Sequence, residues 1–302
     1  MKNNTKYFWR ICAWIAVIIL IIFILARIYY TLTDDFRLNN ISYELPHEKN
    51  WVIADSTQEQ ERQILQILDQ PFSYLGKGAQ SYAFASKDGQ YVIKFFKFKH
   101  LRPSWFVDIL PPAGFLKTYK DKQSARKTRK LFGVFHSYKL AYDVDRDDSG
   151  LIFIQLNTEN NPQRTVTVID KIGFSRNIDL SGIPFILQYK GETLRTVLSG
   201  LLKLGDVHTA ETRIGQIIDL YSREYSQGIY DHDHGILQNT GFVGSTPIHL
   251  DVGKLVREEK MRDPTFKKQD LSIVALKINH WVEKNFPHYS GEIAAYIDEK
   301  IK

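Results

Sequence analysis

The chain has 302 residues, of which 43 % are hydrophobic and 25 % charged, a composition typical of a globular protein and not of a disordered one. The formal net charge of +6 fits an anionic partner such as a nucleotide or a membrane surface. Nucleic acid is not expected, because no known binding module accompanies the charge. The only cysteine, Cys12, excludes an internal disulfide and a thiolate zinc site.

An apolar segment near the N-terminus predicts a membrane-spanning helix over residues 11–30, after a flank over residues 1–10. Its uncharged part, residues 11–26, approaches the ~20 residues that a spanning helix needs if Arg27 extends its guanidinium to the headgroups. The alternative is a cleaved signal peptide, but its apolar region is usually shorter, and residues 24–26 make a poor cleavage site. The sequence therefore predicts a single-pass protein with the lipid bilayer as a partner.

The segment that follows the apolar run changes character twice. Residues 31–56 are polar, contain Pro46 and lack a strong periodicity, which predicts a juxtamembrane linker. Residues 58–68 have an acidic start and then apolar positions at helical spacing, which predicts a short amphipathic helix.

Two strands around an Asp-Gly turn come next. Residues 72–75 lead into Gly76-Lys77-Gly78, and residues 81–84 continue the strand pattern. After the turn at residues 87–90, residues 91–96 form another strand, which contains Lys94. The pattern predicts a β-hairpin with a glycine-containing first strand and a lysine within the strand that leaves the turn.

The rest of the chain alternates between strand and helix patterns before becoming mainly helical. We expect a helix with a basic first half over residues 124–142, strands over 151–156, 165–169 and 183–188, a helical region over 192–227, a hairpin over 240–243 and 248–252, and helices over 271–285 and 292–302. This order predicts an α+β fold with a strand-rich front and a helical back.

The first candidate site combines Gly76 and Gly78 with Lys94. Glycines let backbone N–H groups approach phosphate closely because no Cβ intervenes, and a lysine on a neighbouring strand supplies a positive charge. The alternative is a flexible turn beside a solvated lysine.

The second candidate site lies at the two ends of the late hairpin. Asn239 and Asp251 would be brought together by its strands, and an amide and a carboxylate oxygen are suitable ligands for Mg²⁺. The alternative is an ordinary hairpin with polar ends.

The third candidate site is the segment Asp231-His232-Asp233-His234, before Asn239. A carboxylate here could accept a proton from an incoming hydroxyl group. Two alternatives stay open: a loop rich in capping residues, or a metal site completed by His249 and Asp251.

In this order and at these spacings, five segments resemble the motifs of the protein-kinase-like superfamily. Residues 75–84 resemble the glycine-rich loop, residues 92–94 the strand motif Val-Ala-Ile-Lys, and residues 186–191 the hinge between lobes. Residues 233–239 resemble the catalytic loop, and residues 251–253 the Asp-Phe-Gly motif. The resemblance implies a bilobal domain over residues 57–302, with a β-rich N-lobe (57–188) and a small helical C-lobe (189–302), that uses ATP and Mg²⁺.

The resemblance also implies a role for each matched residue. Gly76 and Gly78 would lie over the phosphates, Lys94 would contact them, Gln188, Tyr189 and Lys190 would face the adenine, Asn239 and Asp251 would ligate Mg²⁺, and Asp233, or secondly Asp231, would be the catalytic carboxylate.

Several features depart from the family pattern. Ser81 stands at the third glycine position, and no carboxylate occurs between Asp121 and Asp143, where the partner of Lys94 is expected. Glu61 or Asp121 would have to replace the missing glutamate as the partner of Lys94. Asp233 lies six residues before Asn239, whereas the catalytic aspartate normally lies five before the asparagine, at the position of His234.

The short C-terminal part resembles compact small-molecule and lipid-sugar kinases more than regulated protein kinases, because only 49 residues follow Gly253. The first hypothesis is therefore a membrane-anchored, ATP- and Mg²⁺-dependent phosphotransferase whose acceptor is a small molecule, a lipid-sugar or a protein. The alternatives are a membrane-tethered pseudokinase that acts as a binding module, and a metal-dependent hydrolase that uses the histidine and aspartate cluster.

The sequence leaves open the role of one basic stretch and the side of the membrane on which the domain lies. The basic stretch over residues 117–130 is either a solvated helix face or a contact for an anionic membrane or substrate. The charges around the apolar segment favour a domain outside the cytoplasm, whereas ATP chemistry favours one inside it.

Overall fold

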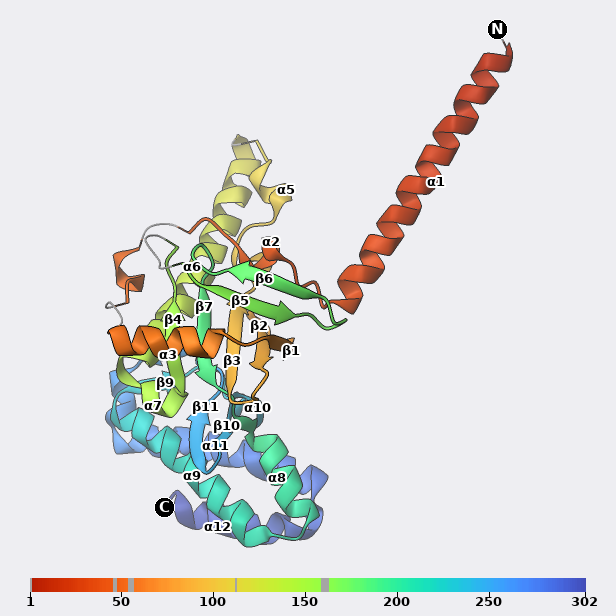
Figure 1. The fold of residues 1–302 in the computed structure, drawn as a ribbon. Coiled ribbons are helices and arrows are strands. Elements are labelled where there is room, and N and C mark those ends of the chain that lie inside the picture. The colour runs from red at the N-terminus through yellow and green to blue at the C-terminus, as the bar shows by residue number, and fades with distance from the viewer. Residues whose placement is uncertain (1, 46–47, 54–56, 112, 159–162) are drawn as a thin grey trace.

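The computed structural model describes residues 2–45, 48–53, 57–111, 113–158 and 163–302. It is an α+β structure in which a curled, mixed seven-stranded sheet lies on one side of a group of helices, and one long apolar helix projects away from both (Figure 1). The α+β class expected from the order of the elements is confirmed. We call the part that contains the seven-stranded sheet the sheet region, and residues 192–302 the helical region.

The projecting helix, α1 (Lys2–Leu32), is longer than the expected segment 11–30. Its part Tyr7–Leu32 has a mean hydropathy of 3.0, and none of its most apolar window is buried. By length and composition this helix can span a membrane, a test that a signal sequence also passes. The turn after the helix contains Asp34 and Asp35, whose φ angles of 53° and 65° are in the left-handed region that aspartate tolerates better than most residues.

The segment expected as a linker contributes to the core. Phe36 and Ile41, at the two ends of a stretch that includes the short helix α2 (Leu38–Ile41), are buried against the sheet. Further on, Trp51 ends the 3-10 helix η1 (Lys49–Trp51), and its ring lies 4.8 Å from the ring of Phe135 on α6 (Gly114–Val144). These apolar residues are isolated in a polar segment, so they leave no periodic pattern in the sequence.

The sheet follows the order β4-β7-β3-β2-β1-β5-β6, and only the pairing of β1 with β5 is parallel. Its strands are β1 (Phe72–Lys77), β2 (Ser81–Ser86), β3 (Tyr91–Phe96), β4 (Leu151–Gln155), β5 (Thr165–Ile169), β6 (Ser175–Asp179) and β7 (Phe185–Tyr189). Strand β6 was not expected, because Ile178 is its only buried residue. The sequence alternation places neighbours on opposite faces: Phe95 belongs to one core cluster and Phe96 to another.

Helices cover both faces of the sheet. Helix α3 (Gln58–Leu68), which starts at a capping box formed by Thr57 and Gln60, buries Ile64, Ile67 and Leu68 on the face of Phe95. On the other face, α6 buries only its second half, at positions spaced three and four residues apart: Leu131, Val134, Phe135, Tyr138 and Ala141. The short helices α4 (Phe98–Leu101), α5 (Trp105–Asp108) and α7 (Arg146–Ser149) connect α6 to its neighbours.

The helical region is built from α8 (Leu194–Lys203), α9 (Val207–Ser226), α11 (Pro264–Asn285) and α12 (Ser290–Lys300), which share a third core. The helical pattern expected over residues 192–227 is interrupted at Gly205, where a φ of 75° ends α8 and Asp206 caps α9. Short elements carry the chain between these helices: β8 (Glu192–Thr193), β9 (Ile229–Asp231), α10 (Ile236–Asn239), β10 (Thr240–Val243), β11 (Thr246–His249), β12 (Leu255–Arg257), η2 (Glu259–Arg262) and η3 (Pro287–Tyr289).

Candidate functional site

The hairpin of β10 and β11 joins the two expected metal ligands. Thr240 pairs with His249, so Asn239 and Asp251 lie just beyond the paired ends of the strands. The carbonyl oxygen of Asn239 accepts hydrogen bonds from the N–H of Leu250 at 2.6 Å and of Asp251 at 3.2 Å. Within the described part of the chain, Oδ1 of Asn239 and Oδ2 of Asp251 take part in no hydrogen bond. Both oxygens are thus free acceptors of the kind that Mg²⁺ prefers.

Close packing fixes the orientation of Asp251. Its Oδ1 accepts a hydrogen bond from the N–H of Gly253 at 3.1 Å and lies 3.5 Å from the hydroxyl group of Tyr138 on α6. Burial and the charge of Asp251 raise the pKa of Tyr138 well above its usual value, so the tyrosine remains a donor. A Cβ at position 253 would lie 2.8 Å from Oε1 of Gln80, which places the Asp-Val-Gly turn against the glycine-rich loop.

Lys94 reaches the same point from β3. Its ammonium group donates a hydrogen bond to the carbonyl of Leu250. Burial lowers the pKa of Lys94, and the nearby charge of Asp251 opposes that shift. Neither carboxylate that the sequence offered as a partner forms an ion pair with Lys94: Glu61 pairs with Arg164 at 2.6 Å, and Asp121 is exposed on the first half of α6.

The glycine-rich loop connects β1 to β2 above this lysine. The N–H of Gly78 donates to the carbonyl of Ser81 at 2.9 Å, and the register of β1 shifts between Tyr74 and Gly76. A Cβ at Gly76 would meet no atom within 4 Å, and one at Gly78 would meet only Ser81 at 3.9 Å. Packing within the chain therefore does not require these two glycines, and the open space beside them suits the close approach of an external group such as phosphate.

A second lysine at the loop was not anticipated from the sequence. Lys97, just after β3, is 5 % exposed, and its ammonium group donates to the carbonyl of Gly78. Burial lowers the pKa of Lys97 to about 8. The only sequence signal is a lysine surrounded by phenylalanines at residues 95–98, which is unusual for a solvated side chain.

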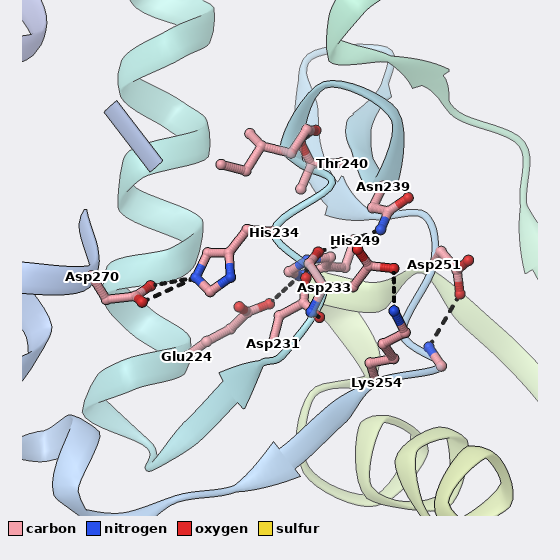
Figure 2. Close-up of polar contacts among 12 residues, drawn as sticks. Glu224, Asp231, Asp233, His234, Asn239, Thr240, His249, Asp251, Lys254 and Asp270 are labelled. Atoms are coloured by element: carbon pink, nitrogen blue, oxygen red, sulfur yellow. Dashed lines mark hydrogen bonds and ion pairs between the residues drawn. The ribbon is translucent and has the colours of Figure 1, made fainter. Parts of the chain in front are cut away.

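The two candidate catalytic carboxylates occupy different environments. Asp233 is partly exposed, faces Asn239 and Asp251, and its Oδ2 lies 3.0 Å from the ammonium group of Lys254 (Figure 2). Asp231 is fully buried, and its Oδ1 accepts a hydrogen bond from the N–H of Asp233 at 2.7 Å. The structure thus brings Asp233 to the open side of the site and leaves Asp231 behind it.

His234, at the position where the family has its aspartate, points away from Asn239 and Asp251 (Figure 2). Its Nε2 lies 2.8 Å from Oδ2 of Asp270 on α11. Burial would raise the pKa of Asp270, but hydrogen bonds with His234 and Tyr225 outweigh that effect and lower it. His234 therefore joins the segment between β9 and α10 to α11.

Behind Asp233, a buried chain of ionisable groups joins α9 to the loop. Nδ1 of His249 lies 2.6 Å from Oε1 of Glu224, and its Nε2 lies 3.6 Å from Oδ2 of Asp231; all three residues are fully buried. Burial alone would lower the pKa of His249, but the two carboxylates raise it well above its usual value. Burial and the charge of Glu224 raise the pKa of nearby Asp145 to about 8.

This buried chain was missed in the sequence, although one signal was present. Glu224 follows Ile217 and Tyr221 at helical spacing on the apolar face of α9, and a carboxylate in that position needs a buried partner.

The three residues that were expected to face an adenine are largely engaged within the protein. Gln188 is buried, and its Nε2 donates to the carbonyls of Ser149 at 2.6 Å and His249 at 3.1 Å. The N–H of Tyr189 donates to the carbonyl of Gly150 at 3.0 Å. The N–H of Lys190 donates to the carbonyl of Gln90 at 2.8 Å. The adenine contact implied for these three residues stays a prediction, and it would have to use groups other than these N–H donors.

The alternative of a transition-metal site finds no support in the described residues. They contain no group of three or more histidine, cysteine, aspartate or glutamate side chains placed to hold a metal ion. His234 and His249 are each paired with a carboxylate instead.

Comparison with known proteins adds little to this picture. No protein-family model and no curated protein matches the chain. Solved structures that are similar include the bifunctional kinase-methyltransferase WbdD, at 13 % identity and a TM-score of 0.35, with 75 % of this chain and 46 % of that chain covered. WbdD in a co-crystal with a kinase inhibitor matches at 14 % identity and a TM-score of 0.36 over 74 % of this chain. The match spans 44 % of that WbdD chain, and a similarity at this level carries no argument about function.

Proposed function

We propose that this chain is a membrane-anchored, kinase-like phosphotransferase that uses ATP and Mg²⁺. The observation that supports the proposal is the convergence of Lys94 from β3, Asp233 and Asn239 from the segment between β9 and β10, and Asp251 and Lys254 from the turn after β11. These elements are far apart in the sequence, and each contributes a residue type that phosphoryl transfer requires. In this proposal the sheet region is the N-lobe, the helical region is the C-lobe, and α1 is the anchor.

The residues would divide the chemistry among themselves as follows. Asn239 and Asp251 would hold Mg²⁺ through their unengaged oxygens, and the ion would neutralise charge on the phosphates. Lys94 would release or share its bond to Leu250 and contact the phosphates, since an ammonium group has three donors and one is used here. Asp233 would accept a hydrogen bond, and then the proton, from the attacking hydroxyl group of the acceptor.

Asp233 is the better candidate for this role than Asp231. Its carboxylate lies on the side of Asn239 and Asp251, whereas Asp231 has no access to solvent. Asp231 would instead position the loop through its bond to the N–H of Asp233. The proposal specifies the acceptor only as a molecule that carries a hydroxyl group.

One observation favours the alternative of a pseudokinase. Among the described residues, no carboxylate forms an ion pair with Lys94, and its ammonium group is directed at a carbonyl. An active kinase normally holds this lysine with a glutamate. A binding module would keep the nucleotide site without turnover.

Thermal unfolding of the full chain in detergent micelles, with and without Mg·ATP, tests the nucleotide site. Ligand at 100 times its Kd stabilises the folded state by about 2.7 kcal/mol, which corresponds to a rise in Tm of roughly 5–10 °C for a domain of this size. We expect this rise in the wild type and its loss in Lys94→Met and Asp251→Asn. No rise at millimolar nucleotide contradicts the proposal.

A second measurement separates the kinase from the pseudokinase. We expect Asp233→Asn to keep the Mg·ATP-dependent rise in Tm and to lose ATP turnover. A wild type that binds Mg·ATP but shows no more turnover than Asp233→Asn, with any acceptor offered, would support the pseudokinase. Retained turnover in Asp233→Asn would remove this residue from the catalytic role.

A further inference from the structure

The sheet region carries a protrusion on the side from which α1 also extends. Helix α5 and the first half of α6 (residues 114–130), which we call the α5–α6 tip, project beyond the sheet and away from the helical region (Figure 1). Only the second half of α6 is buried, so the tip packs against little of the rest of the chain. The charge and the apolar side chains of its exposed surface therefore indicate what the tip can bind.

The charge of the tip is strongly positive. Residues 114–130 contain seven lysines and arginines and a single carboxylate, Asp121. Most of the cations are exposed, among them Lys117, Lys122, Arg126 and Lys130. Clusters of this kind next to a membrane attract anionic lipid headgroups.

Large apolar side chains are exposed at the same place. Phe115, at the start of α6, is 81 % exposed, and Ile109 and Phe106 just before it are 68 % and 48 % exposed. Tyr119, one turn further, is 44 % exposed. A combination of exposed aromatic and aliphatic side chains with lysines and arginines is typical of segments that lie in the interface of a bilayer.

A second exposed apolar group lies at the foot of α1. Phe174 and Ile172, in the turn between β5 and β6, are 59 % and 40 % exposed. This turn and the start of β6 are bonded to the end of α1 and the residues just after it: Lys171 lies 3.0 Å from Asp34, and Arg176 donates to the hydroxyl group of Tyr29. The turn therefore lies where a bilayer spanned by α1 would begin.

We propose that the α5–α6 tip and the β5–β6 turn bind the surface of an anionic phospholipid bilayer, the one that α1 spans. The proposal rests on the membrane anchorage within the proposed function. It makes the domain contact the bilayer at three places, with the apolar side chains inserted among the lipids and the cations on the headgroups. The domain would then have one fixed orientation on the membrane.

The native cysteine allows anchorage and docking to be measured separately. We would reconstitute the full chain into nanodiscs of phosphatidylcholine with phosphatidylglycerol and attach a fluorophore to one cysteine at a time: Cys12 itself in α1, or position 115 in Cys12→Ser/Phe115→Cys. The control is Cys12→Ser/Leu204→Cys, because Leu204 is 85 % exposed at the turn between α8 and α9 in the helical region. A nitroxide-labelled lipid then reports which probes lie in the bilayer.

We expect the probes at positions 12 and 115 to be quenched at least about threefold more than the probe at 204. Position 115 should lose its quenching in discs of phosphatidylcholine alone, and after charge reversal by Lys122→Glu/Arg126→Glu/Arg129→Glu, while position 12 stays quenched. Quenching at 12 with none at 115 would overturn docking and leave the anchor intact. Quenching at position 115 that does not depend on lipid charge would contradict the proposal that the tip binds anionic lipids. The absence of quenching at position 12 would contradict the membrane anchorage by α1.

Discussion

The carbonyl oxygen of Asn239 accepts a hydrogen bond from the N–H of Asp251 at 3.2 Å, across the end of a β-hairpin. This bond ties the two proposed metal ligands together through the backbone, and it leaves Oδ1 of Asn239 and Oδ2 of Asp251 free for a ligand. The distance between the two residues is set by the hairpin, while Oδ1 of Asp251 orients its carboxylate.

The first prediction follows from that separation of roles. Asn239→Ala should change the free energy of unfolding by no more than about 0.5–1 kcal/mol, because its side chain makes only a 3.5 Å contact with the carbonyl of Asp233. It should abolish the Mg²⁺-dependent part of nucleotide binding, measured by titration with ATP in the presence and absence of Mg²⁺. Gln238→Ala, an exposed neighbour, is the control and should bind as the wild type does. Unchanged Mg²⁺ dependence in Asn239→Ala would remove the residue from the metal site.

Lys254 gives the second prediction, since its ammonium group lies 3.0 Å from Oδ2 of Asp233. Lys254→Met should lower kcat roughly 100-fold with little change in nucleotide binding, because the lost charge would act on the developing charge at the transferred group. Lys260→Met removes a nearby lysine that pairs with Glu258 instead, and it should leave kcat unchanged. Equal losses in the two variants would indicate a general effect of charge.

The buried chain around His249 gives the third prediction, a loss of stability as pH rises. The folded-state pKa of His249 is raised above 6.5, so its contribution to stability is complete below that pH and is lost as pH rises towards the folded value. Asp145 acts in the same direction, because its pKa is raised from 3.8 to about 8 in the folded state. Between these two values the folded state holds a proton that the unfolded state has lost, so the free energy of unfolding falls as pH rises. Glu224, Asp231 and the ring of Tyr221 also face His249.

We expect the free energy of unfolding in urea to fall by about 1–3 kcal/mol between pH 6.5 and 8.5. Glu224→Gln should flatten this dependence, because it removes a charge that raises the pKa of both His249 and Asp145. A wild-type stability that is constant or rises over this range would contradict the assignment.

The fourth prediction concerns the segment between α1 and the sheet. Phe36→Ala should destabilise the domain by about 3–5 kcal/mol, because the ring is buried among Tyr82, Phe84 and Phe95. Leu38→Ala, two residues along and 45 % exposed, should cost less than about 1 kcal/mol. Chemical unfolding of both variants checks the difference, and similar small effects would restore the linker interpretation.

The fifth prediction concerns the choice of base. The N–H groups of Tyr189 and Lys190 are used within the protein, so they cannot read the edge of an adenine. We therefore expect ATP and GTP to bind with Kd values within about tenfold of each other. A preference of more than 100-fold for ATP in competition binding would show that the hinge opens to contact the base.

Much of the candidate site could be predicted because short-range turn chemistry controls it. The Asp-Gly turn at residues 87–90 fixes where Lys94 lies in its strand, and the hairpin after Asn239 fixes the separation of Asn239 from Asp251. Both are local arrangements that a few neighbouring residues determine.

The parts that could not be predicted depend on contacts between distant residues. The partner of Lys94 is the backbone carbonyl of a residue 156 positions away. Because every residue has a carbonyl, no residue type in the sequence identifies this partner. Phe36 and Ile41 are single apolar residues whose burial depends on the sheet. The choice between Asp231 and Asp233 as the catalytic carboxylate depends on which of them is buried beside His249 and Glu224. That contact forms only when the helical region packs.

The end of α1 is bonded to the strand that carries the loop glycines. Asp34 lies 2.7 Å from Lys77, which stands between Gly76 and Gly78, and it also accepts a hydrogen bond from Tyr74. The bond to Lys77 is the main cause that lowers the pKa of Asp34 to about 2, so the contact persists across the physiological pH range. In the proposed anchored state, a change in the tilt of α1 would therefore pull on β1. Through these contacts, the thickness and tension of the membrane would act on the loop where a nucleotide would bind.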